Sequence, residues 1–376
     1  MPETESSLAG YISKSMGIIM GRYPQMIEKS KNNWLNYSRL LAIFYGMPAL
    51  VAIGTYVMAF ALALLTFFSP DGIHFADKSY MTIKINILYF WTLGIAADLK
   101  AWQIFLVLNL IFGFSFLSVF FSNEWFCDTM KGLFVEGGLE KFKRNFLVLM
   151  PGVSSAILLV TTALNTLGER VGAEVGGPTF SDPFSEILTL SYAAVSEEIG
   201  FRLVPILIPT ATYLLLKTRD SMEGLSRGTK VFMTLTAVLK PESYLRNVKT
   251  EPDRCFIILK ASLILISATM FSFAHVLSGS WGLGKIPSTF VAGVAIGFSS
   301  VRYGFDSAIL LHWFFNYYWA AISSAKRAGV PLINEVAYTV TAYLGIFMLL
   351  YFVFSSFAED TTLKDPQKSV DNKTVR

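Results

Sequence analysis

The sequence predicts an all-α, polytopic integral membrane protein with about eight transmembrane helices. Two observations support this prediction. The 376 residues are 53% hydrophobic and only 15% charged, whereas about a quarter of the residues in a soluble domain are charged. The apolar residues also form runs long enough to cross a bilayer, which takes about 20 residues of helix. A water-soluble enzyme is therefore excluded, because no compact soluble fold could bury this much apolar surface.

The composition excludes two further classes of protein. The two cysteines, Cys127 and Cys255, are too few and too far apart for a disulfide-stapled secreted module, and we interpret them as incidental thiols. A net charge of +4 is small for a chain of this size and requires no nucleic-acid partner. The placement of Lys and Arg along the chain is more informative than their sum.

Eight segments have the length and composition of membrane-spanning helices. The fourth is long for one crossing and contains Pro205 and Pro209, so a bend or a break is expected there. A further apolar stretch, Ile85 to Ala97, has thirteen residues and is closer in length to an interfacial or re-entrant segment. The predicted spans are Leu40–Phe68, Ala101–Phe121, Phe146–Leu164, Ile187–Leu216, Phe256–Leu277, Ile286–Val301, Ser307–Ser324 and Val336–Phe357.

The basic residues predict the orientation of these spans, because short cytoplasmic loops collect Lys and Arg. With eight crossings, the strongly basic connection 217–254 and the basic connection before residue 146 fall on the same side as both termini, which are therefore predicted to be cytoplasmic. The Gly-rich connection 165–184, where Arg170 is the one basic residue, falls on the other side. Counting residues 85–97 as a further crossing would break this pattern.

The predicted domain organisation is simple. One helical domain, residues 40–357, lies between a cytoplasmic N-terminal segment (1–39) and a polar, disordered tail (358–376). The N-terminal segment has no uninterrupted apolar stretch and does not resemble a signal peptide. Within the basic connection 217–254, the run Val231–Leu239 either forms an amphipathic helix on the membrane surface or belongs to a solvated loop.

Three charges interrupt the fourth predicted span. A charged side chain costs about 3 kcal/mol near the centre of a membrane helix, so it needs a partner or a task. Glu198 and Arg202 are four residues apart and share a helix face, which allows them to pair. Glu197 is rotated from Glu198 by about 100° and has no local counter-ion. It is either free for chemistry or paired with a charge on another helix.

Two of the three histidines also lie in apolar helices. His275 follows Phe271 by four residues, and Asn316 follows His312 by four, so each pair shares a helix face. A lone histidine in such a helix is usually a hydrogen-bonded core residue. Together with the glutamates and the asparagine, however, these two histidines predict one polar cavity inside the bundle. The third, His74, lies in a loop.

Such a cavity suits general-base chemistry on a water molecule. A carboxylate and an imidazole, Glu197 and His275, could activate the water, and His312 and Asn316 could donate hydrogen bonds to an oxyanion. The same Glu and His side chains could instead hold zinc, although the chain has no His-Glu-x-x-His motif. The serine, cysteine and aspartate nucleophile patterns of other peptidases are missing.

Three ordered motifs connect these residues to a known family. They occur within 120 residues, all in hydrophobic segments, and they resemble the signature of the CAAX protease and bacteriocin-processing (CPBP, or Abi) family, which includes the type II CAAX prenyl endopeptidases. The resemblance covers roughly residues 184–324. The motifs are Glu197-Glu198-x-x-x-Arg202, Phe271-x-x-x-His275 and His312-x-x-x-Asn316.

The resemblance implies an eight-helix intramembrane endopeptidase that is catalytically competent, because no signature position departs from the family pattern. Glu197 with His275 would activate water, Glu198 would orient the site or pair with Arg202, and the His and Asn of the last motif would stabilise the oxyanion. The substrate would be a hydrophobic or lipidated peptide. In the CAAX branch it would be a prenylated tail that loses the three residues after the modified cysteine.

Several alternatives stay open at this point. The protein could be a zinc-dependent peptidase that uses Glu197, His275 and His312 as ligands. It could also be a non-enzymatic immunity factor or transporter whose cavity binds an ion or a peptide. Other members of the family process peptides, confer immunity to bacteriocins or regulate surface proteins. The sequence predicts membrane lipids as surroundings and does not predict an oligomeric state.

Two details concern helix packing around the cavity. Gly293 and Gly297 have the Gly-x-x-x-Gly spacing that lets helices approach closely. A helix that begins at Phe256 would carry His275 about 29 Å along its axis, close to the opposite membrane surface. We therefore expect this helix either to begin after Lys260 or to be tilted.

Overall fold

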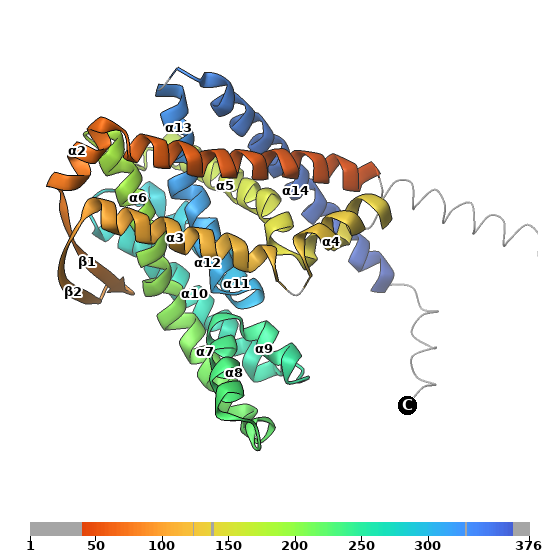
Figure 1. Cartoon of the computed structure of the whole chain (residues 1–376). Coiled ribbons are helices and arrows are strands. Elements are labelled where there is room, and N and C mark those ends of the chain that lie inside the picture. The colour runs from red at the N-terminus through yellow and green to blue at the C-terminus, as the bar shows by residue number, and fades with distance from the viewer. Residues whose placement is uncertain (1–39, 123, 137–138, 328, 364–376) are drawn as a thin grey trace, which may run out of the picture.

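The computed structural model describes residues 40–363 except 123, 137–138 and 328 (Figure 1), so the predicted segment 1–39 and the end of the tail lie outside it. It confirms an all-α membrane fold. In the described part, six helices are long and apolar enough to cross a membrane. They are Leu40–Phe67, Ala101–Phe120 (α3), Phe146–Arg170 (α5), Pro183–Lys217 (α6 to α7), Arg254–Leu277 (α10) and Pro331–Ser355 (in α14).

The other two predicted spans are also helices, but they are less apolar. α11 covers Ile286–Tyr303, and the next helix runs from Phe305 to Arg327 through α12 (Phe305–Trp313), the π-helix η6 (Phe314–Tyr318) and α13 (Trp319–Arg327). α12 packs against α3, α6 and α11, and its residues 307–313 are all buried. Because protein surrounds it, this helix tolerates polar residues. That all eight helices cross the membrane stays a prediction.

Short helices form most of the connections. In α8, Val231, Phe232 and Leu235 are each more than half exposed, as expected of an amphipathic helix on the membrane surface. α14 (Pro331–Leu363) continues six residues past the predicted end at Phe357. The connecting elements are α2 (Pro70–Lys78), α4 (Phe126–Lys131), η1 (Gly132–Glu136), η2 (Leu139–Arg144), η4 (Arg219–Met222), α8 (Arg227–Leu239), α9 (Pro241–Asn247) and η5 (Leu283–Lys285).

The apolar stretch between the first two spans forms a β-hairpin and no helix. β1 (Tyr80–Ile87) and β2 (Trp91–Lys100) pair antiparallel. The turn between them places Leu88 and Tyr89 at φ values of 47° and 67°, as in the tight turns that match the twist of a hairpin. The Tyr192 hydroxyl on α6 bonds to both the N–H and the carbonyl of Lys84, which fixes β1 to α6.

The long fourth span is one continuous helix with a widened segment in its middle. α6 (Pro183–Glu198) leads into the π-helix η3 (Ile199–Leu207) and then into α7 (Ile208–Lys217). Where a bend was predicted at the prolines, the helix widens into the π-helix η3. Pro205, inside η3, has no N–H to donate to an α-helical hydrogen bond. Such π-segments are frequent at functional sites, and Glu197 and Glu198 lie immediately before this one.

α10 and α11 pack closely, as the glycine spacing predicts. A Cβ on Gly293 would lie 3.1 Å from the Cα of Ala268, and one on Gly297 would lie 3.2 Å from the Ile264 side chain. A side chain at either glycine would therefore require the neighbouring atoms of α10 to move by a few tenths of an ångström. This contact packs α11 against the helix that carries the second motif of the signature.

α10 begins earlier than we expected. Its N-cap is Asp253, whose carboxylate accepts a hydrogen bond of 2.8 Å from the Phe256 amide. Lys217, which donates to the same carboxylate, contributes most to lowering the pKa of Asp253 to about 2, so the cap stays charged at neutral pH. The expected start after Lys260 is therefore wrong. The helix ends at Leu277, and His275 lies two residues before that end.

Candidate active site

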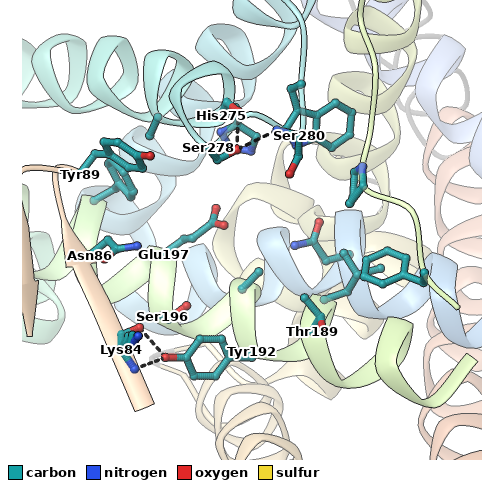
Figure 2. A pocket seen from close by; sticks show the side chains of 18 residues that line it. Lys84, Asn86, Tyr89, Thr189, Tyr192, Ser196, Glu197, His275, Ser278 and Ser280 are labelled. Atoms are coloured by element: carbon teal, nitrogen blue, oxygen red, sulfur yellow. Dashed lines mark hydrogen bonds between the residues drawn. The ribbon is translucent and has the colours of Figure 1, made fainter. Parts of the chain in front are cut away.

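The signature residues meet at one pocket of about 320 Å³. Three of them line its wall: Glu197 from α6, His275 from α10 and Asn316 from η6. Figure 2 shows the side chains of Glu197 and His275 directed into the cavity from opposite sides. The structure therefore brings together residues that are up to 120 positions apart in the chain.

A buried ion pair lies behind the pocket wall. Glu198 and Arg202 are both fully buried, and an Arg202 Nη1 atom lies 3.1 Å from Glu198 Oε1. This is the pair that the spacing of four residues predicted. Glu198 Oε1 also lies 2.7 Å from Nδ1 of His312, which donates to the carboxylate. Glu198 therefore links α6 to α12 and fixes the orientation of the imidazole.

His312 lies between the two glutamates. Its Nδ1 faces Glu198, and its Nε2 is 3.7 Å from Glu197 Oε2. The His312 side chain is 6% exposed, whereas that of Glu197 is 31% exposed. His312 is thus behind Glu197, while Asn316 is on the pocket wall. The two residues have different surroundings because His312 lies between the two glutamates, whereas Asn316 borders the open pocket.

His275 presents one ring nitrogen to the pocket. Its Nδ1 lies 2.9 Å from the carbonyl oxygen of Phe271. Because a carbonyl only accepts, Nδ1 carries the hydrogen and Nε2 of the neutral ring has a free lone pair. In the part of the chain that the structure describes, no direct hydrogen bond joins His275 to Glu197. The space between them is part of the pocket and can hold a water molecule or a substrate atom.

Phe271 has a role that the sequence did not indicate. The Arg202 guanidinium lies over its ring, 4.2 Å from the centroid, and the His275 ring packs edge-on against it at 4.6 Å. A desolvated cation gains about 2 kcal/mol from such a contact. The first residue of the second motif therefore supports both the buried cation and the histidine.

The β-hairpin supplies a side of the pocket that sequence reasoning missed. Lys84, Asn86 and Tyr89 all line the cavity, and the Tyr89 hydroxyl donates to the Leu277 carbonyl at the end of α10. The alternation of apolar and polar residues from Met81 to Ile87 is the signal that could have predicted a strand here. Other residues on the wall that were not predicted include Tyr192, Ser196, Ser278, Ser280 and Trp281.

The residues proposed as zinc ligands do not form a metal cluster. Within the described residues, no group of three or more His, Cys, Asp or Glu side chains is placed to hold a metal ion. Nδ1 of His312 donates to Glu198 and Nδ1 of His275 donates to a backbone carbonyl, which leaves Nε2 of each neutral ring with a free lone pair, as in histidines that bind metals. The choice between a metal-free site and the zinc-dependent alternative is therefore left to the chelation experiment.

The buried ion pair gives a prediction about stability. We expect Arg202→Leu to lower the free energy of unfolding by about 3–5 kcal/mol, because Glu198 would stay buried without its cation. As a control, Arg327→Leu breaks an exposed ion pair with Glu186 and should cost about 0–1 kcal/mol. Unfolding of the purified variants in detergent measures both. Equal effects of the two substitutions would show that the buried pair has no special structural role.

The fold and the pocket define a class of protein: a polytopic membrane protein with a carboxylate, a histidine and an asparagine on the wall of a cavity inside its helical bundle, and with a second histidine behind the carboxylate. Comparison with protein families gives the particular family. Residues 181–318, which are 138 of the 376 and include all signature positions, match the family described as Rce1-like type II CAAX prenyl endopeptidase. This part of the chain is therefore similar to the domains of that family. No curated protein and no solved structure matched the chain.

Proposed function

We propose that the protein is an intramembrane endopeptidase that hydrolyses a peptide bond with water activated by Glu197 and His275. The observation that carries the proposal is the placement of these two side chains on one pocket, inside the domain that matches the family. Glu197 is partly exposed to the pocket, and the lone pair on Nε2 of His275 is free across the cavity from it. A water molecule between them would have an acceptor in each direction.

The proposed reaction needs four events at this pocket. Glu197 accepts a proton as the oxygen of the water attacks the carbonyl carbon, while His275 Nε2 orients the same water. The side-chain amide of Asn316 donates to the oxygen of the tetrahedral intermediate. The carbon–nitrogen bond then breaks, and the protonated Glu197 returns its proton to the leaving nitrogen. The products are a carboxylic acid and an amine.

The roles of the remaining signature residues follow from their positions. Nε2 of His312 faces Glu197. Because Nδ1 carries the hydrogen that is donated to Glu198, Nε2 can donate to Glu197 or to the oxyanion only when both ring nitrogens carry hydrogen. The charge of that form would be balanced by the glutamates on either side. We propose Asn316 as the main oxyanion donor and His312 as a residue that positions Glu197. Glu198 and Arg202 would hold His312 in place.

We also propose that the reaction uses no metal ion. A strong chelator should leave the rate of peptide cleavage unchanged, because the pocket side chains alone supply the base and the hydrogen-bond donor. The check is activity after dialysis against chelator, together with elemental analysis of the active protein. Loss of activity that added zinc restores would contradict this proposal and favour the zinc-dependent alternative.

The family description suggests the first substrate to try. The purified protein, in detergent, is incubated with a farnesylated CAAX peptide and with the same peptide unmodified, and mass spectrometry identifies the products. We expect cleavage at one bond, and release of the last three residues would place the protein in the prenyl endopeptidase branch. Intact peptides after binding to the protein would contradict the proposal and favour a non-enzymatic peptide-binding or immunity protein.

The charge distribution supports a proposal for the orientation in the membrane. Basic residues crowd the ends of α7, α10 and α11 and the connections next to them, which by the positive-inside tendency makes this face cytoplasmic. An even number of crossings would place both termini on the same face. We therefore propose a multi-pass protein with cytoplasmic ends and with membrane lipid around the six apolar helices.

A further inference from the structure

A second cavity lies on the surface of the bundle, between α3 and the helices α6 and α12 that pack against it. Its volume is about 830 Å³. Val195 and Ile309 on its wall are buried. Phe114, Leu117 and Phe121 also line it and are each more than half exposed. Because α3 is one of the apolar spans, this cavity is an apolar groove that is open to membrane lipid. We call it the α3 groove.

The α3 groove has the depth of one leaflet of a bilayer. Along α3 its lining runs from Ile111 to Ser122, which is about 16 Å by the helical rise of 1.5 Å per residue. Ser122 follows Phe120, the last residue of α3, by two positions. It therefore lies close to a membrane surface, and Ile111 lies near the middle of the span. Half of the hydrocarbon core is about 15 Å thick, so a lipid chain that enters at Ser122 fills the groove within its own leaflet.

A basic pocket adjoins the groove at the end of α3. It has a volume of about 580 Å³, and Lys240 and Ser122 line both cavities. Its walls come from the residues after α3, from η2, from α9 and from the end of α11. Glu124 is the one acidic residue among the described residues on its wall. The basic residues there are Lys143, Arg144, Lys240, Arg246 and Arg302.

Carboxylates balance the charges of the basic pocket only in part. Three of its cations are paired: Arg144 with Glu124, Lys240 with Asp306, and Arg302 with Glu242. In the part of the chain that the structure describes, no carboxylate pairs with Arg246, whose guanidinium donates to the Ser243 hydroxyl at 2.8 Å. Five cations and three carboxylates leave a net charge of +2. The pocket is therefore electrostatically complementary to an anion.

The α3 groove is separate from the active-site pocket. Val195 and Ile199 line the groove, whereas Ser196 and Glu197 line the active-site pocket. These residues alternate along one helix, so α6 and the start of η3 form a wall between the two cavities. A molecule in the groove would pack against the back of the segment that carries Glu197, away from the proposed reaction.

We propose that the α3 groove and the basic pocket together bind one anionic phospholipid. One acyl chain lies in the groove, the other stays in the surrounding lipid, and the headgroup phosphate lies at Arg246. Basic pockets between membrane helices are known to bind anionic headgroups, and here such a pocket adjoins an apolar groove of leaflet depth. A zwitterionic lipid offers the same chains, but its cationic group would meet the cations of the pocket. The inference does not depend on the proposed peptidase function.

The first test compares lipids on the purified wild-type protein. Native mass spectrometry from a mild detergent counts the lipids that stay bound during titration with dioleoylphosphatidylglycerol, with the corresponding phosphatidylcholine, with diolein, which has no phosphate, and with soluble glycerol phosphate. We expect one phosphatidylglycerol per chain, bound at least about tenfold more tightly than each of the others. Equal binding of phosphatidylcholine or diolein would overturn the inference, and so would equally tight binding of glycerol phosphate.

The second test concerns the headgroup. Arg246→Gln should weaken the binding of phosphatidylglycerol about fivefold, which is the usual contribution of one basic side chain to binding an anionic lipid. The matched control is Arg227→Gln, which removes the same charge from an exposed position on α8 that lines neither cavity. The control should bind phosphatidylglycerol like the wild type. Equal weakening by the two substitutions would show that overall charge, and no specific pocket, attracts the lipid.

The third test concerns the acyl chain. Leu117→Trp adds bulk in the groove and should weaken binding about fivefold or more, since the chain would be overpacked. The control is Leu106→Trp, at another exposed position of α3 about 16 Å further along the helix and outside the groove. Thermal unfolding without added lipid checks that both variants are folded. Unchanged binding by Leu117→Trp would overturn the inference. Displacement of phosphatidylglycerol by a farnesylated peptide would also overturn it, because the groove would then belong to the substrate.

Discussion

Replacing Glu197 with Gln should lower kcat/KM for peptide hydrolysis by about 10²–10⁴-fold, which is the usual contribution of a general base. Gln has nearly the same size and can occupy the same place beside His312, whose Nε2 lies 3.7 Å from the Glu197 carboxylate. It cannot accept a proton from water at neutral pH. The variant should therefore keep its fold and its affinity for peptide while it loses turnover.

A matched control separates the chemistry from a general effect of charge removal. Glu169→Gln changes an exposed glutamate at the end of α5, on the same face as the pocket mouth. This variant should retain the wild-type rate. Steady-state kinetics with a fluorogenic hydrophobic peptide measures both, and thermal unfolding in detergent checks that each variant is folded. Wild-type turnover by Glu197→Gln would exclude Glu197 as the base.

Replacing Gly200 with Ala should displace the β-hairpin and remove most of the activity. A Cβ at this position would lie 2.1 Å from the carbonyl oxygen of Asn86 and 3.0 Å from its carbonyl carbon. Both are backbone atoms, so no side-chain rotation can relieve the clash. The hydrogen bond from the Leu88 amide to the Gly200 carbonyl would break as the hairpin moved away from η3.

The expected loss is large because the hairpin is a wall of the pocket. Overpacking of this kind costs about 1–3 kcal/mol of stability, and a 1 Å misplacement of a substrate-positioning group can cost about 10²-fold in rate. The control is Gly113→Ala in α3, where a Cβ would meet no atom within 4 Å. Gly113→Ala should be neutral or slightly stabilising. Equal activity in the two variants would show that the hairpin does not shape the site.

The sequence was sufficient to predict the residues of the site but not their arrangement. Burying a charge in a membrane helix is costly, so Glu197, Glu198 and Arg202 stood out in an apolar segment. The spacing of four residues between Glu198 and Arg202 predicted the ion pair that the structure shows. The same spacing predicted that His312 and Asn316 share a face. In the structure Asn316 lies on the pocket wall and His312 lies behind Glu197, a difference that depends on what packs around each residue and not on their spacing.

The β-hairpin was missed for a different reason. The short length of the apolar stretch 85–97 suggested an interfacial or re-entrant segment. The strict alternation of Met81, Ile83, Ile85 and Ile87 with polar residues, which is typical of a strand, was not used. The contact of Phe271 with Arg202 was not predictable either, since it joins α10 to η3 and depends on how these two helices pack against one another. Local patterns therefore identified the helices, while the walls of the pocket depend on tertiary contacts.

The most direct test of the proposed catalysis is a double-variant cycle on Glu197 and His275. If the two side chains activate the same water, Glu197→Gln, His275→Gln and the double variant should have nearly the same low rate, because removing either partner already disables the unit. The rate of single-turnover cleavage of one hydrophobic peptide by each purified, folded variant gives the answer. Multiplicative losses, or substantial cleavage by the double variant, would contradict the account.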